Sequence, residues 1–176
     1  NVAIGPDCMG AVNNDSSDYN VAIGRDTLYG GTGALIGCIA IGSYALKTTT
    51  NQAQTGTIAI GHQSLTALTS GARNLAIGSG SLATITVGHD NIAIGHASMG
   101  SFNNGTSYDD KNVCIGNNTM TATNTIGGRK NTFIGHDAAS GEWTTAVSNF
   151  NVGIGAQSMM GAMNGGSYNV AIGYRA

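Results

Sequence analysis

A short apolar pattern recurs along the whole chain: an aliphatic residue, a small residue and Ile, followed each time by Gly. Successive Ile–Gly pairs lie 17 to 21 residues apart. A fixed period of this length predicts a stack of similar units. The ten isoleucines are Ile4, Ile23, Ile41, Ile60, Ile77, Ile94, Ile115, Ile134, Ile154 and Ile172. The glycines that follow them, interpreted as structural glycines of each unit, are Gly5, Gly24, Gly42, Gly61, Gly78, Gly95, Gly116, Gly135, Gly155 and Gly173.

The residues of this pattern are typical of β-strands. Alternate side chains of a strand point to the same side, so the aliphatic residue and the Ile share one face and the small residue between them lies on the other. We expect the Ile face to form the core of the coil. The small residue is Ala in seven copies, and we expect its face to pack closely against a neighbouring sheet or subunit.

An Asn opens eight of the ten copies, and Cys38 and Thr57 replace it in the other two. An Asn side chain both donates and accepts hydrogen bonds, so stacked copies can bond from one unit to the next. The predicted asparagine ladder consists of Asn1, Asn20, Asn74, Asn91, Asn112, Asn131, Asn151 and Asn169.

Each Gly is predicted to form a corner, because a residue without Cβ tolerates positive φ and close backbone approach. Five residues after the Ile stands a Leu or Met in eight copies, with Ala139 as an exception. We therefore expect each unit to supply two short strands and a bend. All variation in length falls between this Leu or Met and the next Asn, as in a solenoid with one loop edge. A Gly in every unit and many β-branched residues argue against helix.

Composition narrows the function. Charged residues make up 9% of the chain and the formal net charge is -2, so no basic patch for nucleic acid is present. No apolar run is long enough to cross a bilayer, and no membrane insertion is expected in this segment. Cys8, Cys38 and Cys114 fall at different phases of the repeat and fit no zinc or redox motif, so they are interpreted as small apolar residues.

The phrase Asn20-Val21-Ala22-Ile23-Gly24 and its copies, followed by Ser or Thr and Leu, resemble a known rung motif. It is similar to the motif of the left-handed parallel β-roll in the heads of trimeric autotransporter adhesins, and to the repeats of viral fibre proteins such as phage tail fibres. The resemblance covers essentially all 176 residues. It implies an all-β, left-handed parallel β-roll or β-solenoid of about ten rungs that forms a homotrimer. Residues 1–176 are then one β-roll repeat domain, a segment of a longer fibre protein.

Candidate chemistry is sparse. His62, His96 and His136 each follow the Gly of their unit, but other residues interrupt the column, so they are interpreted as solvent-facing corner residues. No metal site and no cofactor are predicted. No catalytic residue is predicted either, because a glycosidase needs two carboxylates that face one cleft and a stacked rod offers no obvious cleft. Exposed aromatic residues on loops are common in carbohydrate recognition. Tyr108, Asp109 and Trp143 are therefore the candidate receptor-binding loop residues.

The sequence thus favours a structural segment of a homotrimeric phage tail fibre on the virion surface, which attaches to a host receptor or glycan through displayed loops. The long unit and elaborate loops favour this over the tighter repeat of an adhesin head. The alternative is the head of a bacterial trimeric autotransporter adhesin on the outer surface, mediating cell or matrix adhesion. An enzymatic spike is a third class, and the chain is not expected to be an enzyme.

Overall fold

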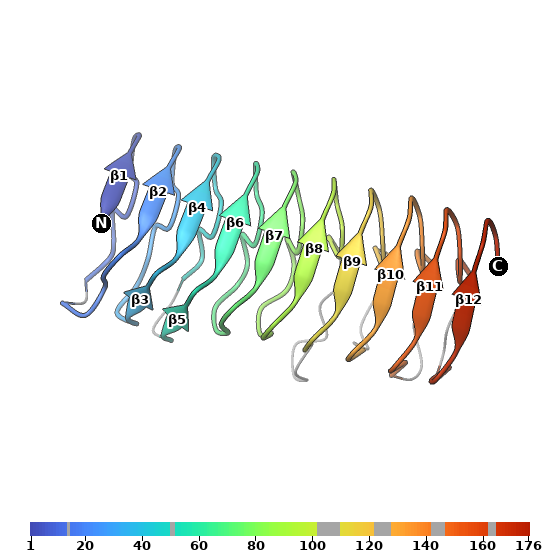
Figure 1. Cartoon of the computed structure of the whole chain (residues 1–176). Coiled ribbons are helices and arrows are strands. Elements are labelled where there is room, and N and C mark those ends of the chain that lie inside the picture. The colour runs from blue at the N-terminus through green and yellow to red at the C-terminus, as the bar shows by residue number, and fades with distance from the viewer. Residues whose placement is uncertain (14, 50–51, 102–109, 122–127, 142–146, 162–164) are drawn as a thin grey trace.

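Stacked parallel strands form almost all the regular structure of the chain. The computed structural model describes residues 1–13, 15–49, 52–101, 110–121, 128–141, 147–161 and 165–176, and no helix occurs in them. Ten strands form one parallel sheet in the order β1-β2-β4-β6-β7-β8-β9-β10-β11-β12, which runs the length of a rod (Figure 1). They are β1 (Val2–Ile4), β2 (Val21–Ile23), β4 (Ile39–Ile41), β6 (Ile58–Ile60), β7 (Leu75–Ile77), β8 (Ile92–Ile94), β9 (Val113–Ile115), β10 (Thr132–Ile134), β11 (Val152–Ile154) and β12 (Val170–Ile172). The expected all-β parallel solenoid is confirmed.

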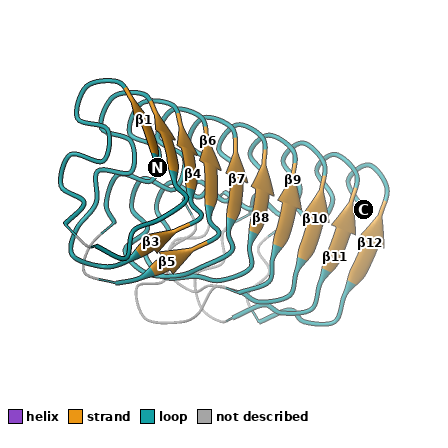
Figure 2. Ribbon diagram, turned by 60° about the vertical axis from the view of Figure 1, so that its left-hand side comes forward, coloured by secondary structure: helices purple, strands orange, loops and turns teal. Residues whose placement is uncertain are grey.

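Equivalent residues of successive units lie directly beside one another. Ile94 of β8 pairs with Ile77 of β7 and with Ile115 of β9, and the same like-on-like register holds along the sheet. We call one strand of this sheet with the turn that follows it a rung. Two further strands, β3 (Leu35–Ile36) and β5 (Gln54–Thr55), form a separate parallel pair (Figure 2).

The two faces of the sheet are the reverse of the prediction. The small residue of each strand points inward, and Ala22, Ala40, Ala59, Ala76 and Ala93 are fully buried. The ten isoleucines predicted as structural core are instead partly or well exposed, from an intermediate level in the central rungs to 68% at Ile172. The reason is the narrow interior. The Leu or Met of the opposite turn, such as Leu65 and Leu82, already fills it, so only a small side chain fits on the sheet side.

The predicted second strand after each Gly is also wrong. A tight turn follows the Gly, and the Leu or Met lies in it with φ near +50°, for example +50° at Leu65 and +49° at Leu82. The glycine corner itself is confirmed. Gly95 has φ +133°, and a Cβ there would collide with the carbonyl group of Gly116 in the next rung. Tight stacking of the corners therefore requires Gly as well as permitting it.

The asparagine ladder is confirmed. Asn112 Oδ1 accepts hydrogen bonds from the backbone N–H of Asn131 at 3.1 Å and from its Nδ2 at 3.2 Å. Asn112 Nδ2 in turn donates to Asn91 Oδ1 and to the carbonyl of Gly128. The same contacts link every neighbouring pair from Asn74 to Asn169. From Asn91 to Asn151 each buried amide is thus bonded to the rungs on both sides, which fixes their register.

One rung departs from this core pattern and is compensated by its neighbours. Phe133 occupies the inward position of β10 and is fully buried, whereas seven of the other rungs hold Ala there. In the preceding rung the equivalent residues Cys114 and Met120 touch, with Sγ and Sδ 3.6 Å apart. In the β10 rung the Met is replaced by Ala139, which leaves room for the ring. A Cβ on Gly153 of the following rung would lie 2.9 Å from Cδ1 of Phe133, so that rung also yields space.

Candidate interaction surface

The outward side of the ten-stranded sheet carries two columns of aliphatic side chains. We call these two columns the apolar face. One column holds Val2, Val21, Ile39, Ile58, Leu75, Ile92, Val113, Thr132, Val152 and Val170, and the other holds the ten isoleucines that precede the rung glycines. Thr132 is the single polar residue among them. Ten strands at about 4.8 Å spacing make this face about 43 Å long.

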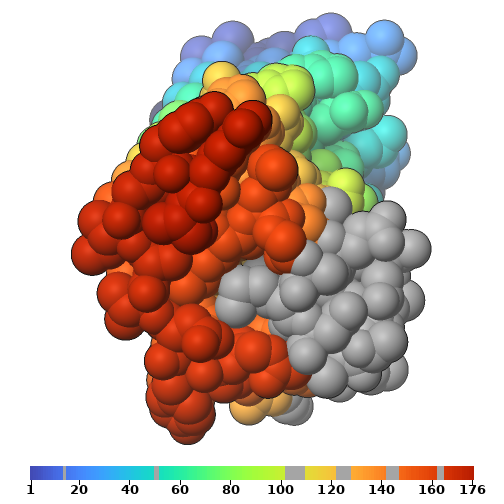
Figure 3. Space-filling model, turned by 90° about the vertical axis from the view of Figure 1, so that its right-hand side faces the viewer, coloured from blue at the N-terminus to red at the C-terminus, as the bar shows by residue number. Residues whose placement is uncertain are grey.

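Part of this face remains open to solvent in the single chain. Ile4 is 58% exposed, Ile134 36% and Ile154 37%. Strands of three residues are about 10 Å long, so the face projects on the order of 400 Å². That is within the range of about 300–600 Å² that the largest apolar patch of a monomeric protein covers, and such patches are often functional. Seen along the rod from its C-terminal end, successive rungs lie one behind another (Figure 3).

Two columns of mostly exposed residues, many of them charged or polar, border the apolar face. We call the residues that precede each ladder position the Asn-side edge: Tyr19, Gly37, Gly56, Arg73, Asp90, Lys111, Lys130, Phe150 and Tyr168. We call the residues that follow each rung glycine the Gly-side edge: Pro6, Arg25, Ser43, His62, Ser79, His96, Asn117, His136, Ala156 and Tyr174. Most residues of both columns are exposed.

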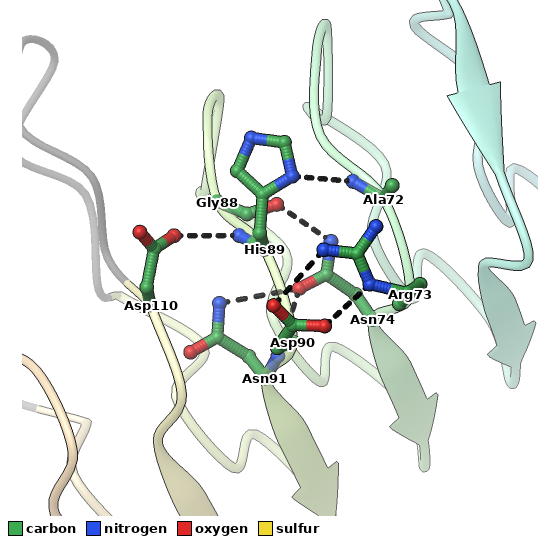
Figure 4. A network of polar contacts seen from close by, with 8 residues as sticks. All are labelled: Ala72, Arg73, Asn74, Gly88, His89, Asp90, Asn91 and Asp110. Carbon is green, nitrogen blue, oxygen red and sulfur yellow. Dashed lines mark hydrogen bonds and ion pairs between the residues drawn. The ribbon is translucent and has the colours of Figure 1, made fainter.

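Ion pairing joins adjacent rungs in the middle of the Asn-side edge. The Arg73 guanidinium donates to both carboxylate oxygens of Asp90, at 2.6 and 3.0 Å (Figure 4). This hydrogen bonding lowers the pKa of Asp90 and raises the pKa of Arg73. Next to this pair, the backbone N–H of Ala72 donates to Nδ1 of His89. Both side chains of the ion pair are largely in solvent, so screening keeps its contribution small.

Aromatic stacking continues the Asn-side edge toward the C-terminal end. The rings of Phe150 and Tyr168 are stacked with centroids 4.9 Å apart and an interplanar angle of 4°. The ammonium of Lys130 lies 4.9 Å from the centroid of the Phe150 ring. Phe150 therefore contacts the side chain before it and the side chain after it in the column. Tyr19 and Tyr168 are 82% and 76% exposed, so they do not cap the apolar core.

The predicted corner histidines do face solvent. His62, His96 and His136 are all exposed. The ring of His62 packs edge-on against Tyr44 with centroids 6.0 Å apart, and Nδ1 of His136 lies 3.0 Å from a carboxylate oxygen of Asp137. Within the described ranges no group of three His, Cys, Asp or Glu residues is arranged to hold a metal ion.

The three cysteines are free thiols in the single chain. Cys38 and Cys114 are buried and Cys8 is half-buried. Burial raises the pKa of the Cys38 and Cys114 thiols, so both stay protonated at neutral pH. The thiol group of Cys8 lies 2.8 Å from Thr27 Oγ1 and takes the place that Ser or Thr has in most other rungs.

The three candidate receptor-binding residues, Tyr108, Asp109 and Trp143, lie outside the described residues. The apolar face was missed by sequence reasoning, which assigned the same isoleucines to the core. The predicted alternation of side chains was correct. Alternation divides the side chains between the two faces of a strand, but it does not show which face lies inside. The described residues contain no helix that is long and apolar enough to cross a membrane.

No protein-family model, curated protein or solved structure matches this chain. The parallel β-solenoid is compatible with the β-roll repeats that the sequence resembles.

Proposed function

We propose that this chain is a structural segment of a homotrimeric phage tail fibre on the virion surface, which carries loops that attach to a host receptor or glycan. The observation that carries the proposal is the apolar face. A rod that exposes aliphatic side chains along one whole side is suited to association with further copies of itself. The number of three subunits comes from the resemblance of the repeat.

Stiffness supports the same role. Backbone bonds between successive strands and the stacked glycine corners tie each rung to the next, and the asparagine ladder adds bonds between the rungs from Asn74 to Asn169. A repeat protein of this kind gains length by adding rungs without a larger core. Such a rod would hold attachment loops at a fixed distance from its base. The head of a trimeric autotransporter adhesin would use the same stiffness and length. It is the second candidate, because the residues of the repeat resemble both classes of protein.

The test is the mass of the purified chain by light scattering. We expect a trimer for the natural sequence. Ile77→Asp together with Ile94→Asp places charges in the middle of the apolar face and should give folded monomers, since both side chains are partly exposed in the single chain. The matched control is Thr84→Asp, an exposed residue of the same rung away from this face, and it should stay trimeric.

A natural chain that is monomeric at all concentrations would contradict the proposal. Attachment is tested separately by adding purified chain to host cells and measuring whether particle adsorption falls. Incubation with host polysaccharide, followed by analysis of chain length, tests the enzymatic class: shortened chains would overturn a structural role.

A further inference from the structure

A second set of bonds between rungs lies beside the asparagine ladder, two residues before the ladder position. There a side chain of one rung accepts a hydrogen bond from the backbone N–H of the equivalent residue in the preceding rung. His89 Nδ1 accepts from Ala72 at 3.2 Å, and Asp110 Oδ1 accepts from His89 at 2.9 Å. Further along the rod, Asn149 Oδ1 accepts from Arg129 at 2.8 Å. We call the side chains of His89, Asp110 and Asn149 the edge acceptors.

An edge acceptor completes the backbone bonding of the rung before it. The carbonyl of Ala72 accepts from the backbone N–H of Asp90 at 3.1 Å, and the N–H of Ala72 donates to the ring of His89. The same pair of bonds is made at Arg129, where the acceptor of the N–H is the Asn149 side chain. The imidazole of His89 therefore takes the place that an amide oxygen has in a later rung.

The bond from Ala72 fixes where the proton of the His89 ring lies. A neutral imidazole has one nitrogen that donates and one that accepts, whereas an imidazolium has two donors. Because Nδ1 accepts in this bond, the single ring proton is on Nε2. A second proton taken from solvent would add to Nδ1 and would place two N–H donors face to face. The amide of Asn149 has no such dependence on protons.

Charged groups of both signs lie around this ring in the described part of the chain (Figure 4). The carboxylate of Asp110 is bonded to the backbone N–H of His89, and Asp90 is the next residue in the chain. The Arg73 guanidinium is bonded to Asp90, and the backbone N–H of Lys111 donates to the carbonyl of His89. Two carboxylates and two cations thus surround the segment, so neither sign of charge is in excess.

We propose that the bond from Ala72 to His89 is a pH-sensitive contact between the segments that lead into β7 and β8. It forms while the ring is neutral and is lost when the ring gains its second proton in mildly acidic solution. Histidine is the side chain that ordinarily changes its charge between about pH 5 and 8. The strand pairing and the asparagine ladder beside it involve no titratable group, so acid should loosen this edge and leave the sheet intact.

Hydrogen exchange of single backbone N–H groups tests the contact. The Ala72 amide reports on the His89 ring, and the Arg129 amide, bonded to Asn149, is the control within the same chain. We expect the protection factor of Ala72, corrected for the intrinsic effect of pH, to fall about 2- to 10-fold between about pH 8 and 5, as for the loss of one net hydrogen bond. Protection at Arg129 should not change.

An NMR titration of the imidazole resonances gives the protonation of His89 directly. At the upper pH the ring nitrogens should show the proton on Nε2. The fall in protection at Ala72 should have the same midpoint as the titration of this ring. That agreement would distinguish the ring from the carboxylates of Asp90 and Asp110, which titrate at lower pH in the usual case.

Substitutions separate the ring from its surroundings. His89→Asn places an amide oxygen where Nδ1 was, as Asn149 does in its own rung, so Ala72 should be protected equally at both pH values. His89→Ala removes the acceptor, and protection at Ala72 should be low at both. Asp110→Asn is the matched control: it removes a carboxylate and keeps an acceptor, so the pH dependence at Ala72 should remain. Circular dichroism checks that each variant keeps its β structure.

Three results would overturn the pH-sensitive contact. The first is constant protection at Ala72 while the ring of His89 titrates, and the second is a ring that does not titrate above about pH 5. The third is a pH dependence that persists in His89→Asn, which would assign the effect to another group. None of these results affects the proposed fibre role, which depends on the mass of the natural chain and not on this edge.

The reverse separation also holds. A chain that is monomeric at all concentrations would contradict the fibre proposal and would leave the contact at His89 unchanged, because both of its partners belong to one chain.

Discussion

In β8 the side chain of Ala93 is fully buried, whereas Ile92 and Ile94, its neighbours in the chain, are partly exposed on the other face. The inner face is closed by the Leu or Met of the opposite turn, and every change of volume there must be compensated. The outer face has no such opposite wall within the chain. The comparison shows that the larger, more apolar residues of a strand need not be the ones inside it, because the space available decides.

The largest effect should come from removing Phe133, the one aromatic side chain that is fully buried among the described residues. Phe133→Ala is expected to lower the free energy of unfolding by about 3–5 kcal/mol, because it deletes a buried ring and leaves a cavity. Phe150→Ala removes the same side chain from the outside, where 40% of it is exposed, and should cost about 1 kcal/mol or less. Urea unfolding of both variants measures the difference, and equal losses would contradict the assignment of inside and outside.

Neighbouring residues of one strand give the next test. Ala93→Leu should destabilise the chain by about 1–3 kcal/mol, because the filled interior cannot take a larger side chain. Ile94→Leu conserves volume on the open face and should change stability by less than about 1 kcal/mol in the single chain. Thermal unfolding followed by circular dichroism compares them. A tolerated Ala93→Leu together with a damaging Ile94→Leu would restore the original prediction of an isoleucine core.

The smallest effect is expected from the ion pair of the Asn-side edge. The pKa of Asp90 is lowered in the folded chain by its hydrogen bonds with Arg73, so its contribution is present above the unfolded carboxyl pKa of about 3.9. That contribution is lost as the pH falls through the lower pKa of the folded state. Asp90→Asn should therefore reduce the unfolding temperature slightly at pH 7 and not at all at strongly acidic pH. An equal reduction at both pH values would show that the ion pair is not the cause.

Sequence reasoning found the elements that repeat and missed those that depend on the shape of the interior. The position of the ten strands of the main sheet, the stacking of like residues and the ladder from Asn74 to Asn169 could be predicted, because each is a local pattern with the period of the rung. The strand pair β3 and β5 was not predicted, because it lies between the Leu or Met and the next Asn, where only loops were expected. The second strand was predicted wrongly because Leu and Met were taken as strand residues. In the structure they occupy tight turns with positive φ, and no residue type in that pattern signals such a conformation.

The residues that break the repeat also show the difference between what the sequence predicts and what depends on the shape of the interior. Phe133, Ala139 and Gly153 each break the repeat at a different position. Only the fold relates them: the ring of Phe133 takes space that Ala139 leaves free and that Gly153 does not occupy. Volume compensation between adjacent rungs depends on distances that sequence spacing does not contain.

By itself the sequence determined a ladder of parallel rungs, because a Gly, an Asn and two aliphatic residues in every unit can satisfy their backbone and bury their side chains only by stacking on their own copies. The tertiary structure alone decided which side of each strand lies inside. The coil is narrow, its opposite wall already supplies the large side chains, and only Ala-sized residues fit against them, so the isoleucines are left on the outside.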